Sequence, residues 1–445
     1  MRDLLITLIV FGSVPFILMR PSIGVLMWSW LGYMNPHRLT WGFAYNFPFS
    51  QIVAASLILG LFFSKEPKKI PFNALTTLWL IWVLWMCMTT FMAIDSSHSA
   101  WELERTLKIQ MMVLATIMVM KTHARINNLV WVIVVSIGFY GVKGGLFTLV
   151  TGGNYLVWGP PMTHITGNNE IAFALVMTLP LMRYLQLETQ HRWVRMGLIV
   201  SMLLVSVSII GSYSRGAFLA GSAMALSLIL KSKNKFRIGV VLVVLGIIAA
   251  AFIPQKWEER MATIQNYEMD ASAMGRINAW RFAINLAKEY PVFGGGFDTF
   301  LPELFQTYAP VPDDFHDAHS IYFEVLAEHG FVGLAIYLLL GLVTLQNGRK
   351  IAKLSKNRES LRWIHNLSSM IQVSIIGYAV GGAFLGLAYF DLYYHLIAIV
   401  ILMRFRAEQE VAREPEPGAR VNIAADESIP QEGGVFAQDE KRSLP

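Results

Sequence analysis

The 445-residue chain is poor in charged residues and almost without cysteine, and both shortages narrow what it can be. Charged residues make up 15% of it, against about 25% in a soluble domain, while hydrophobic residues make up 55%. The one cysteine, Cys87, lies inside an apolar run, so an intrachain disulfide is excluded and we expect a small buried side chain. No Gly-x4-Gly-Lys-Ser/Thr phosphate loop occurs, so an ATPase built on that motif is excluded.

The apolar residues come in blocks of about 15–25, the length that crosses a hydrocarbon core of about 30 Å. The connections between them alternate in character. Basic ones are found at residues 65–69, 121–125, 183–195, 231–237 and 346–362, whereas polar or acidic ones are found at 94–106, 151–170 and 255–318. By the positive-inside rule the basic connections are cytoplasmic and the others periplasmic. The sequence therefore predicts an all-α polytopic protein of the bacterial inner membrane, with both termini in the cytoplasm.

This pattern predicts about 12 transmembrane helices in four parts. Residues 1–254 hold transmembrane helices 1–9, 255–318 form a periplasmic helical segment with helical runs at 256–268 and 276–288, residues 319–404 hold a histidine motif and helices 10–12, and 405–445 form a disordered cytoplasmic tail. The count treats residues 3–35 as one span broken at Arg20 and Pro21. Two separate spans there would give 13 crossings and an outside N-terminus.

Two arginines on the predicted periplasmic side are candidates for binding an anion. Arg215 follows an apolar run, and an arginine at membrane depth costs about 2.5–3.5 kcal/mol, which makes it a functional candidate. The alternative is a turn residue that reaches back to water. Arg276 opens a helical run that places Trp280 on the same face, although these residues taken alone favour a solvated surface charge.

The densest group of chemical side chains lies at residues 316–330, directly before an apolar run. It offers His319 as a proton acceptor near neutral pH, with Ser320, Tyr322 and Glu324 next to it. The alternatives are an interfacial histidine that caps a helix, or half of a zinc site for which no third ligand is near. Three further residues could line a polar cavity on the same side: Lys143, Asn168 and Asn169.

These motifs resemble the O-antigen ligase (WaaL-type) family, and in particular the O-glycosylation ligases of exosortase-associated gene clusters. His319 and Ser320, followed nine residues later by Gly330, are similar to the family's periplasmic His-[Asn/Ser/Gln]-x9-Gly signature. Arg215 in Ser-Arg-Gly, and Arg276 in Gly-Arg-x-x-x-Trp, are similar to its two arginine elements. The opening residues 1–73 resemble the exosortase-associated branch.

The resemblance implies a GT-C-like helical fold and a glycosyltransferase. Its donor would be a glycan on undecaprenyl diphosphate, and its acceptor a hydroxyl group, most simply on the lipid A-core of lipopolysaccharide. The resemblance further implies that Arg215 and Arg276 hold the donor diphosphate and that His319 takes the acceptor proton, in one inverting displacement facing the periplasm. No nucleic acid takes part, and we expect no cofactor.

We also expect no metal, because residues 35–49 lack the acidic pair that metal-dependent membrane glycosyltransferases commonly place in the first periplasmic loop. Three alternatives stay open. Two belong to the same family: a polymerase of lipid-linked glycans and a protein O-oligosaccharyltransferase. The third is a transporter or flippase for anionic lipid-linked solutes. The sequence names neither the glycan nor the acceptor.

Overall fold

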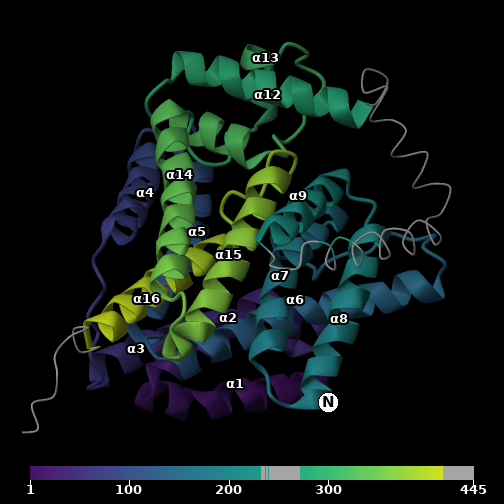
Figure 1. Cartoon of the computed structure of the whole chain (residues 1–445). Coiled ribbons are helices and arrows are strands. Elements are labelled where there is room, and N and C mark those ends of the chain that lie inside the picture. Colours follow the sequence, from purple (N-terminus) through teal and green to yellow (C-terminus); the bar gives the residue numbers. More distant parts are fainter. Residues whose placement is uncertain (232–235, 237–238, 240–270, 414–445) are drawn as a thin grey trace, which may run out of the picture.

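The computed structural model describes residues 1–231, 236, 239 and 271–413, and the regular structure in these residues is helical, without strands (Figure 1). The helices are α1 (Arg2–Met19), α2 (Pro21–Met34), α3 (Phe49–Phe63), α4 (Ala74–Phe91), α5 (Ser96–Val119), α6 (His123–Val150), α7 (Asn168–Glu188), α8 (Arg192–Gly211), α9 (Arg215–Lys231), α12 (Ala271–Glu289), α13 (Pro302–Tyr308), α14 (Ile321–Leu354), α15 (Arg362–Gly381) and α16 (Asp391–Arg413). The predicted run at 256–268 lies outside the described residues, as does the apolar block at 238–254 apart from Gly239.

Six of the described helices, α1, α4, α6, α7, α8 and α14, are long and apolar enough to cross a membrane. The all-helical membrane class is therefore confirmed, while the number of crossings and the GT-C-like comparison stay predictions. The predicted run at 276–288 is confirmed as most of α12. The last helix, α16, continues to Arg413, so the prediction that the disordered tail begins at 405 is wrong at its start.

Helices α1 and α2 fold back on each other. Pro21 starts α2 because it has no N–H with which to continue α1, and Arg20 between them is extended. The Arg2 guanidinium then donates to the Leu39 carbonyl at 3.4 Å, and the Asp3 carboxylate accepts from the Ala44 N–H at 3.1 Å. Both contacts join the start of α1 to the segment after α2. The treatment of residues 3–35 as a single span is therefore wrong.

This hairpin also places the two ends of the described chain apart. The start of α1 lies with the segment at 36–48, and that segment shares a cavity with Asp391, the first residue of α16. Helix α16 begins there and runs away from this cavity, toward the left of the view in Figure 1. The side of the membrane on which each terminus lies stays a prediction, because residues 414–445 lie outside the described residues.

Helix α5 is longer than its apolar part. The Asp95 carboxylate accepts hydrogen bonds from the N–H groups of Ser97 and His98, which caps the helix 11 residues before the predicted apolar block at 107–120 begins. Most of the polar residues expected to form the loop at 94–106 therefore form about three helical turns. This extension carries Glu102 and Arg105 to the cavity described below.

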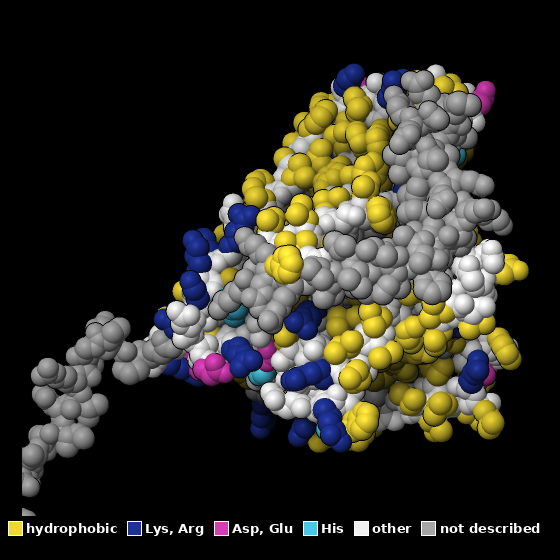
Figure 2. Space-filling model, turned by 45° about the vertical axis from the view of Figure 1, so that its right-hand side comes forward, with side chains coloured by type: hydrophobic (Ala, Val, Ile, Leu, Met, Phe, Trp, Pro, Cys, Tyr) yellow, Lys and Arg dark blue, Asp and Glu magenta, His cyan; other side chains and the backbone are white. Residues whose placement is uncertain are grey.

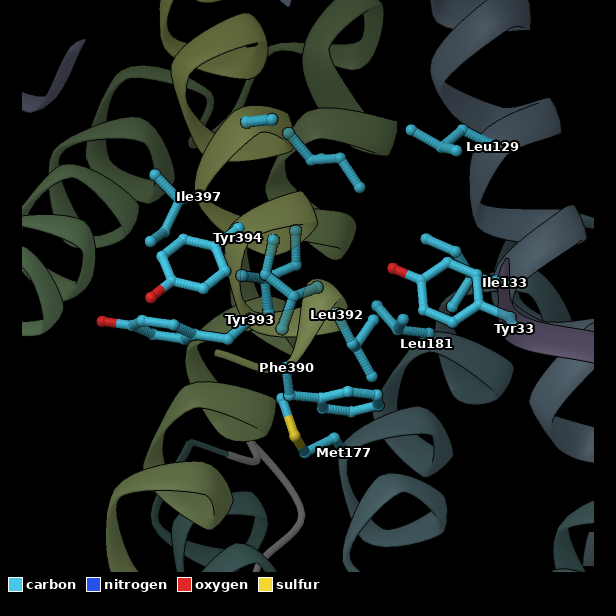
Figure 3. Close-up of a cluster of buried hydrophobic side chains, with 14 of the residues drawn as sticks. Tyr33, Leu129, Ile133, Met177, Leu181, Phe390, Leu392, Tyr393, Tyr394 and Ile397 are labelled. Carbon is cyan, nitrogen blue, oxygen red and sulfur yellow. The ribbon is translucent and has the colours of Figure 1, made fainter. Parts of the chain in front are cut away.

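Helix α16 lies at the centre of the bundle. Every residue from Leu392 to Met403 is buried, as expected of a helix that is apolar all round. Its side chains pack with those of α2, α6 and α7 in a cluster that includes Tyr33, Ile133, Leu181 and Leu392 (Figure 3). A hydrogen bond of 2.5 Å between the Tyr33 hydroxyl and Nδ1 of His395 satisfies two polar groups inside this packing.

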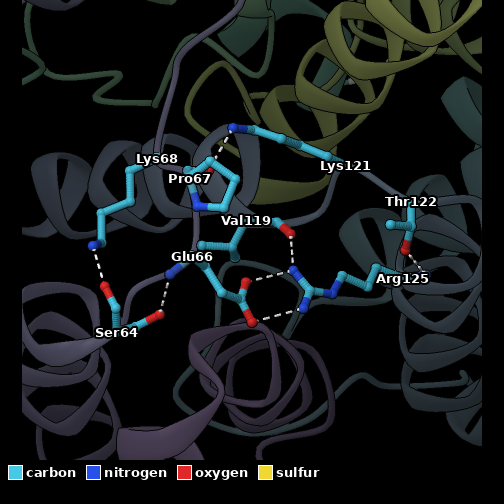
Figure 4. A network of polar contacts seen from close by, with 8 residues as sticks. All are labelled: Ser64, Glu66, Pro67, Lys68, Val119, Lys121, Thr122 and Arg125. Carbon is cyan, nitrogen blue, oxygen red and sulfur yellow. Dashed lines mark hydrogen bonds and ion pairs between the residues drawn. The ribbon is translucent and has the colours of Figure 1, made fainter.

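Basic residues gather toward the lower left of the view in Figure 2, and hydrophobic side chains cover broad areas elsewhere on the visible face. Arg125 forms two hydrogen bonds with the Glu66 carboxylate, at 2.7 and 2.8 Å, and a third with the Val119 carbonyl at 2.8 Å (Figure 4). Lys121 donates to the Pro67 carbonyl at 2.9 Å. These contacts tie the connection before α4 to the connection before α6.

At the opposite end, α12 and α13 lie across the bundle (Figure 1). They share a small aromatic core built around Phe282, whose ring stacks on Phe305 with centroids 4.3 Å apart. The segment between them, and the one that leads from α13 into α14, carry the candidate site.

Candidate active site

His319 lies in a short non-helical segment directly before α14, with a left-handed backbone (φ +41°). The indole N–H of Trp280 donates to the carbonyl of Ala318 at 2.8 Å, so α12 holds the residue before the histidine. The same indole stacks on Phe323, with ring centroids 5.0 Å apart and the planes at 15°. Trp280, predicted from the Gly-Arg-x-x-x-Trp element, thus contacts the chain on both sides of His319.

The loop at 382–390, between α15 and α16, closes the other side of the histidine segment. The N–H of Ile321 donates to the Gly382 carbonyl at 2.8 Å. One carboxylate oxygen of Glu324 accepts from the N–H of Ala388 at 3.3 Å. The first turn of α14 is therefore joined to this loop at two points.

Gly330, the last residue of the histidine signature, has a conformation that explains why glycine stands there. Its φ of +69° interrupts α14, and a Cβ at this position would lie 2.5 Å from the Val292 carbonyl oxygen. The next residue, Phe331, donates its N–H to the Pro291 carbonyl at 2.9 Å. The turn after α12 therefore packs directly on the α14 backbone, which fixes α12 relative to the histidine.

Arg215 and Arg276 are brought together although they are far apart in the sequence. Both are half-buried and line one narrow pocket of about 10 Å³, together with Asn169 and Gly216. At this volume the pocket admits about one water molecule, so a larger anion requires the two side chains to move apart. At the start of α7, the side chain of Asn168 donates a hydrogen bond of 2.8 Å to the Ser212 carbonyl. This bond holds the turn that precedes Arg215.

His319 lines a separate cavity of about 350 Å³ that is rich in carboxyl groups. The predicted Glu324 lies there. The other polar lining residues were not predicted as site residues: Glu102, Arg105, Glu170, Asp298, Asp317, Glu328 and Tyr389. Glu328 stands one helical turn after Glu324, a spacing visible in the sequence. Glu102 and Arg105 required the extension of α5, whereas Asp298 has no sequence signal that we recognise.

Electrostatics link His319 to the arginine pocket. Burial lowers the pKa of His319 below its ordinary value of 6.5, and the positive charge of Arg276 lowers it further, while Asp317 opposes both effects. The imidazole is therefore neutral at pH 7 and available as a proton acceptor. Arg276 thus acts on His319 and also lines the pocket with Arg215, so the three predicted residues form one neighbourhood.

Three predicted residues lie elsewhere or act as structure. Lys143 is exposed and lines two cavities between α6 and its neighbours that do not contain His319. Tyr322 donates its hydroxyl to the Ala379 carbonyl at 2.6 Å and so joins α14 to α15. Ser320 is fully buried and does not line the cavity. Lys143 therefore lines cavities other than that of His319.

Within the described part of the chain, no group of three or more His, Cys, Asp or Glu side chains has the arrangement that could hold a metal ion. His316, the possible zinc partner of His319, instead contacts the Asp314 carboxylate at 2.9 Å. It also packs against Gly275, where a Cβ would lie 2.2 Å from the imidazole. The described side chains therefore do not fit the zinc pair that the sequence left open.

The fold and the site define a helical membrane protein in which one histidine and two arginines line two separate cavities at one end of the bundle. Residues 200–338, which carry all three, match the family described as O-Antigen ligase, and this match supports an O-antigen ligase family assignment. Residues 1–191 match a second family, described as a family of unknown function. No curated protein matches the chain. The O-antigen ligase match indicates an activity of the ligase or polymerase type, carried out on a lipid-linked glycan and an acceptor.

Proposed function

We propose that the chain is a glycosyltransferase that moves a glycan from undecaprenyl diphosphate to an acceptor hydroxyl at the periplasmic face of the bacterial inner membrane. Lipid A-core is the proposed acceptor. The observation that carries this proposal is the position of Arg276, which lines a pocket with Arg215 and also lowers the pKa of His319. An anion-binding pair and a neutral base next to each other are what transfer from a diphosphate requires.

In this reaction the acceptor oxygen attacks the anomeric carbon of the donor sugar. The bond from that carbon to the diphosphate oxygen breaks with its electron pair, the diphosphate leaves, and the acceptor proton moves to His319. A general base contributes about 10²–10⁴-fold. Guanidinium groups meet phosphate oxygens in bidentate fashion, and each charge-assisted hydrogen bond is worth about 1.5–3 kcal/mol. The displacement is single, so it inverts the anomeric centre.

The charges around His319 support a division of the substrates between two places. The carboxyl groups of its cavity, among them Glu102, Glu170 and Asp298, accept hydrogen bonds from sugar hydroxyls and repel a diphosphate. The arginine pocket attracts the diphosphate. A sugar-diphosphate that lies across the two has its anomeric carbon near His319.

The basic residues at the opposite end of the bundle support a cytoplasmic location for that end and a periplasmic one for the site. With the α1–α2 hairpin, this orientation places Met1 in the periplasm and Arg413 in the cytoplasm.

The proposal is tested with purified protein, a lipid-diphosphate-linked glycan and candidate acceptors. We expect conjugate from the wild type and from Arg281→Gln, an exposed arginine on the same helix as Arg276, and a loss of at least 100-fold (about 10²–10⁴) for His319→Gln. Arg276→Gln should also lose activity. Equal activity of all four proteins would refute the assigned roles, and labelled lipid crossing the bilayer without any conjugate would favour a flippase.

Excess EDTA in the same assay should leave the rate unchanged, because the chemistry above uses only side chains. A rate that falls in EDTA and returns with Mg²⁺ or Mn²⁺ would contradict metal independence. A second lipid-linked glycan that serves as a better acceptor than lipid A-core would identify the polymerase alternative of the same family.

A further inference from the structure

A second polar cavity, of about 310 Å³, adjoins the cavity of His319, and Arg105 lines both. It lies between the 3₁₀ turn η1 (Pro36–Leu39), helix α5, the loop at 162–165 and the first residue of α16. None of its lining residues belongs to the pocket of Arg215 and Arg276. The molecule therefore has two separate places next to His319 where cationic side chains line a cavity.

Positive charge dominates this second cavity. Arg38, Arg105 and Lys108 line it, against one carboxyl group, that of Asp391. The ion pairs of these cations leave them available: Arg105 is 3.5 Å from Glu102, and Lys108 pairs with Glu104 where both side chains are at least half exposed. An exposed pair such as that of Lys108 and Glu104 contributes about 0–1 kcal/mol, so a phosphate can replace Glu104 at little cost.

Arg38 is prearranged by two neutral partners. Its guanidinium donates to the side-chain oxygen of Asn46 at 2.7 Å and lies 4.7 Å from the ring centroid of Tyr45. Burial lowers the pKa of His37 to about 4, and burial together with Arg105 lowers that of His164 to about 3, so both histidines in this cavity are neutral at pH 7. The charge of the cavity is thus set by its arginine and lysine side chains and by the carboxyl group of Asp391, and not by the histidines.

The cavity also leads toward the apolar surface of the bundle. Arg38 lines a third cavity, of about 530 Å³, together with Trp30, Trp41 and Lys143. Lys143 in turn lines an apolar groove of about 620 Å³ between α6 and α8. Tryptophan and lysine next to an apolar groove are typical of the region where lipid headgroups lie. A lipid-anchored molecule can therefore place its chains in the groove and its polar part in the cavities that lead to His319.

We propose that Arg38, Arg105 and Lys108 form an anion subsite that holds a phosphate group of a membrane-anchored acceptor while an acceptor hydroxyl lies at His319. This inference rests on the proposed function. A transferase that joins two membrane-anchored substrates must bind both at once, and the arginine pair is assigned to the donor diphosphate. Because Arg105 lines both cavities, an acceptor bound by this subsite extends directly toward the histidine.

The test compares two acceptors that differ only in a phosphate group, one of them treated with phosphatase. Arg38→Gln and Lys108→Gln should each raise the KM of the phosphorylated acceptor by about tenfold, with little change in kcat or in the KM of the donor. The KM of the dephosphorylated acceptor should stay the same. Arg281→Gln, which removes a positive charge at the same end of the molecule but outside both cavities, is the matched control.

An equal rise of KM for both acceptors would overturn the subsite, because the side chains would then act on structure and not on phosphate. No rise for either variant would do the same. The phosphate that binds could also come from the headgroup of a bulk phospholipid. Replacing phosphatidylglycerol with phosphatidylcholine in the vesicles distinguishes the two sources. A KM difference that depends on the vesicle lipid and not on the acceptor also overturns the proposal.

The affinity of the phosphorylated acceptor is also measured directly on the variant His319→Ala, in which turnover is stopped. This measurement tests the subsite independently of the proposed transferase activity. Affinity that falls about tenfold on adding Arg38→Gln supports the subsite even if no transfer is found. Affinity that does not change refutes the subsite even if the wild type transfers glycan.

Discussion

Replacing Trp280 with phenylalanine isolates the hydrogen bond that fixes the backbone beside His319. Phenylalanine keeps the stacking on Phe323, which has centroids 5.0 Å apart, and removes only the indole N–H that reaches the Ala318 carbonyl at 2.8 Å. Ala318 is 2% exposed, so its carbonyl loses its partner in a place that water hardly reaches. A buried group left without its partner costs about 1–3 kcal/mol.

That cost falls on the conformation in which His319 has its left-handed backbone, because the neighbouring carbonyl is no longer held. A change of 1–2 kcal/mol alters the ratio of two conformers by about 5–30-fold. We therefore expect kcat to fall by about 5–30-fold in Trp280→Phe, with the KM of the donor nearly unchanged. The assay is glycan transfer at saturating donor and acceptor.

Trp193→Phe is the matched control, because this tryptophan is 68% exposed at the start of α8 and takes no part in the site. It should retain the kcat of the wild type. The reasoning is refuted if Trp280→Phe keeps full kcat while its circular dichroism spectrum and melting temperature match the wild type, because the hydrogen bond would then be irrelevant to the position of His319.

Three further predictions test other parts of the site. Arg276→Gln removes a positive charge that lowers the pKa of His319, so the acidic limb of the pH profile of kcat/KM, where the base becomes protonated, should move to higher pH. A limb that does not move would show that the charge of Arg276 does not act on His319. Gly330→Ala places a methyl group 2.5 Å from a backbone oxygen at a φ of +69°, so the melting temperature should fall, and an unchanged value would contradict the packing described. Asn168→Ala removes the hydrogen bond that holds the turn before Arg215. The KM of the donor should rise about 3–10-fold, as expected for the loss of a hydrogen bond of about 1 kcal/mol. Both KM and kcat are measured, and an unchanged KM would contradict the role of this hydrogen bond.

The candidate residues for chemistry could be read from short sequence motifs, but the neighbourhood that they form could not. The indole of Trp280 contacts the chain beside His319, and Asn168 holds the turn before Arg215, through hydrogen bonds that span 38 and 44 residues. No local pattern predicts such contacts. Lys143 shows the reverse case. Its charge inside an apolar run suggested a polar cavity on the side of the site, but Lys143 lines two cavities that do not contain His319.

Two errors in the predicted topology have the same cause. Hydropathy counts apolar residues but cannot tell a helix that continues past a break from one that turns back, so the hairpin at Pro21 became visible only through the contacts of Arg2 and Asp3 with residues 39–44. Likewise, polar residues before an apolar block looked like a loop, although the Asp95 cap continues α5 through them. That extension carries Arg105 to both cavities.

The sequence by itself determined the class of the protein, because apolar runs of membrane-spanning length cannot be buried in a soluble domain of this size. It also singled out one histidine and two arginines as the candidates for the chemistry. The tertiary structure alone decided the direction of the first two helices, the acidic lining around His319 and the second cationic cavity. Each of these depends on side chains from distant segments that meet only after the helices have packed, and no spacing along the chain records that meeting.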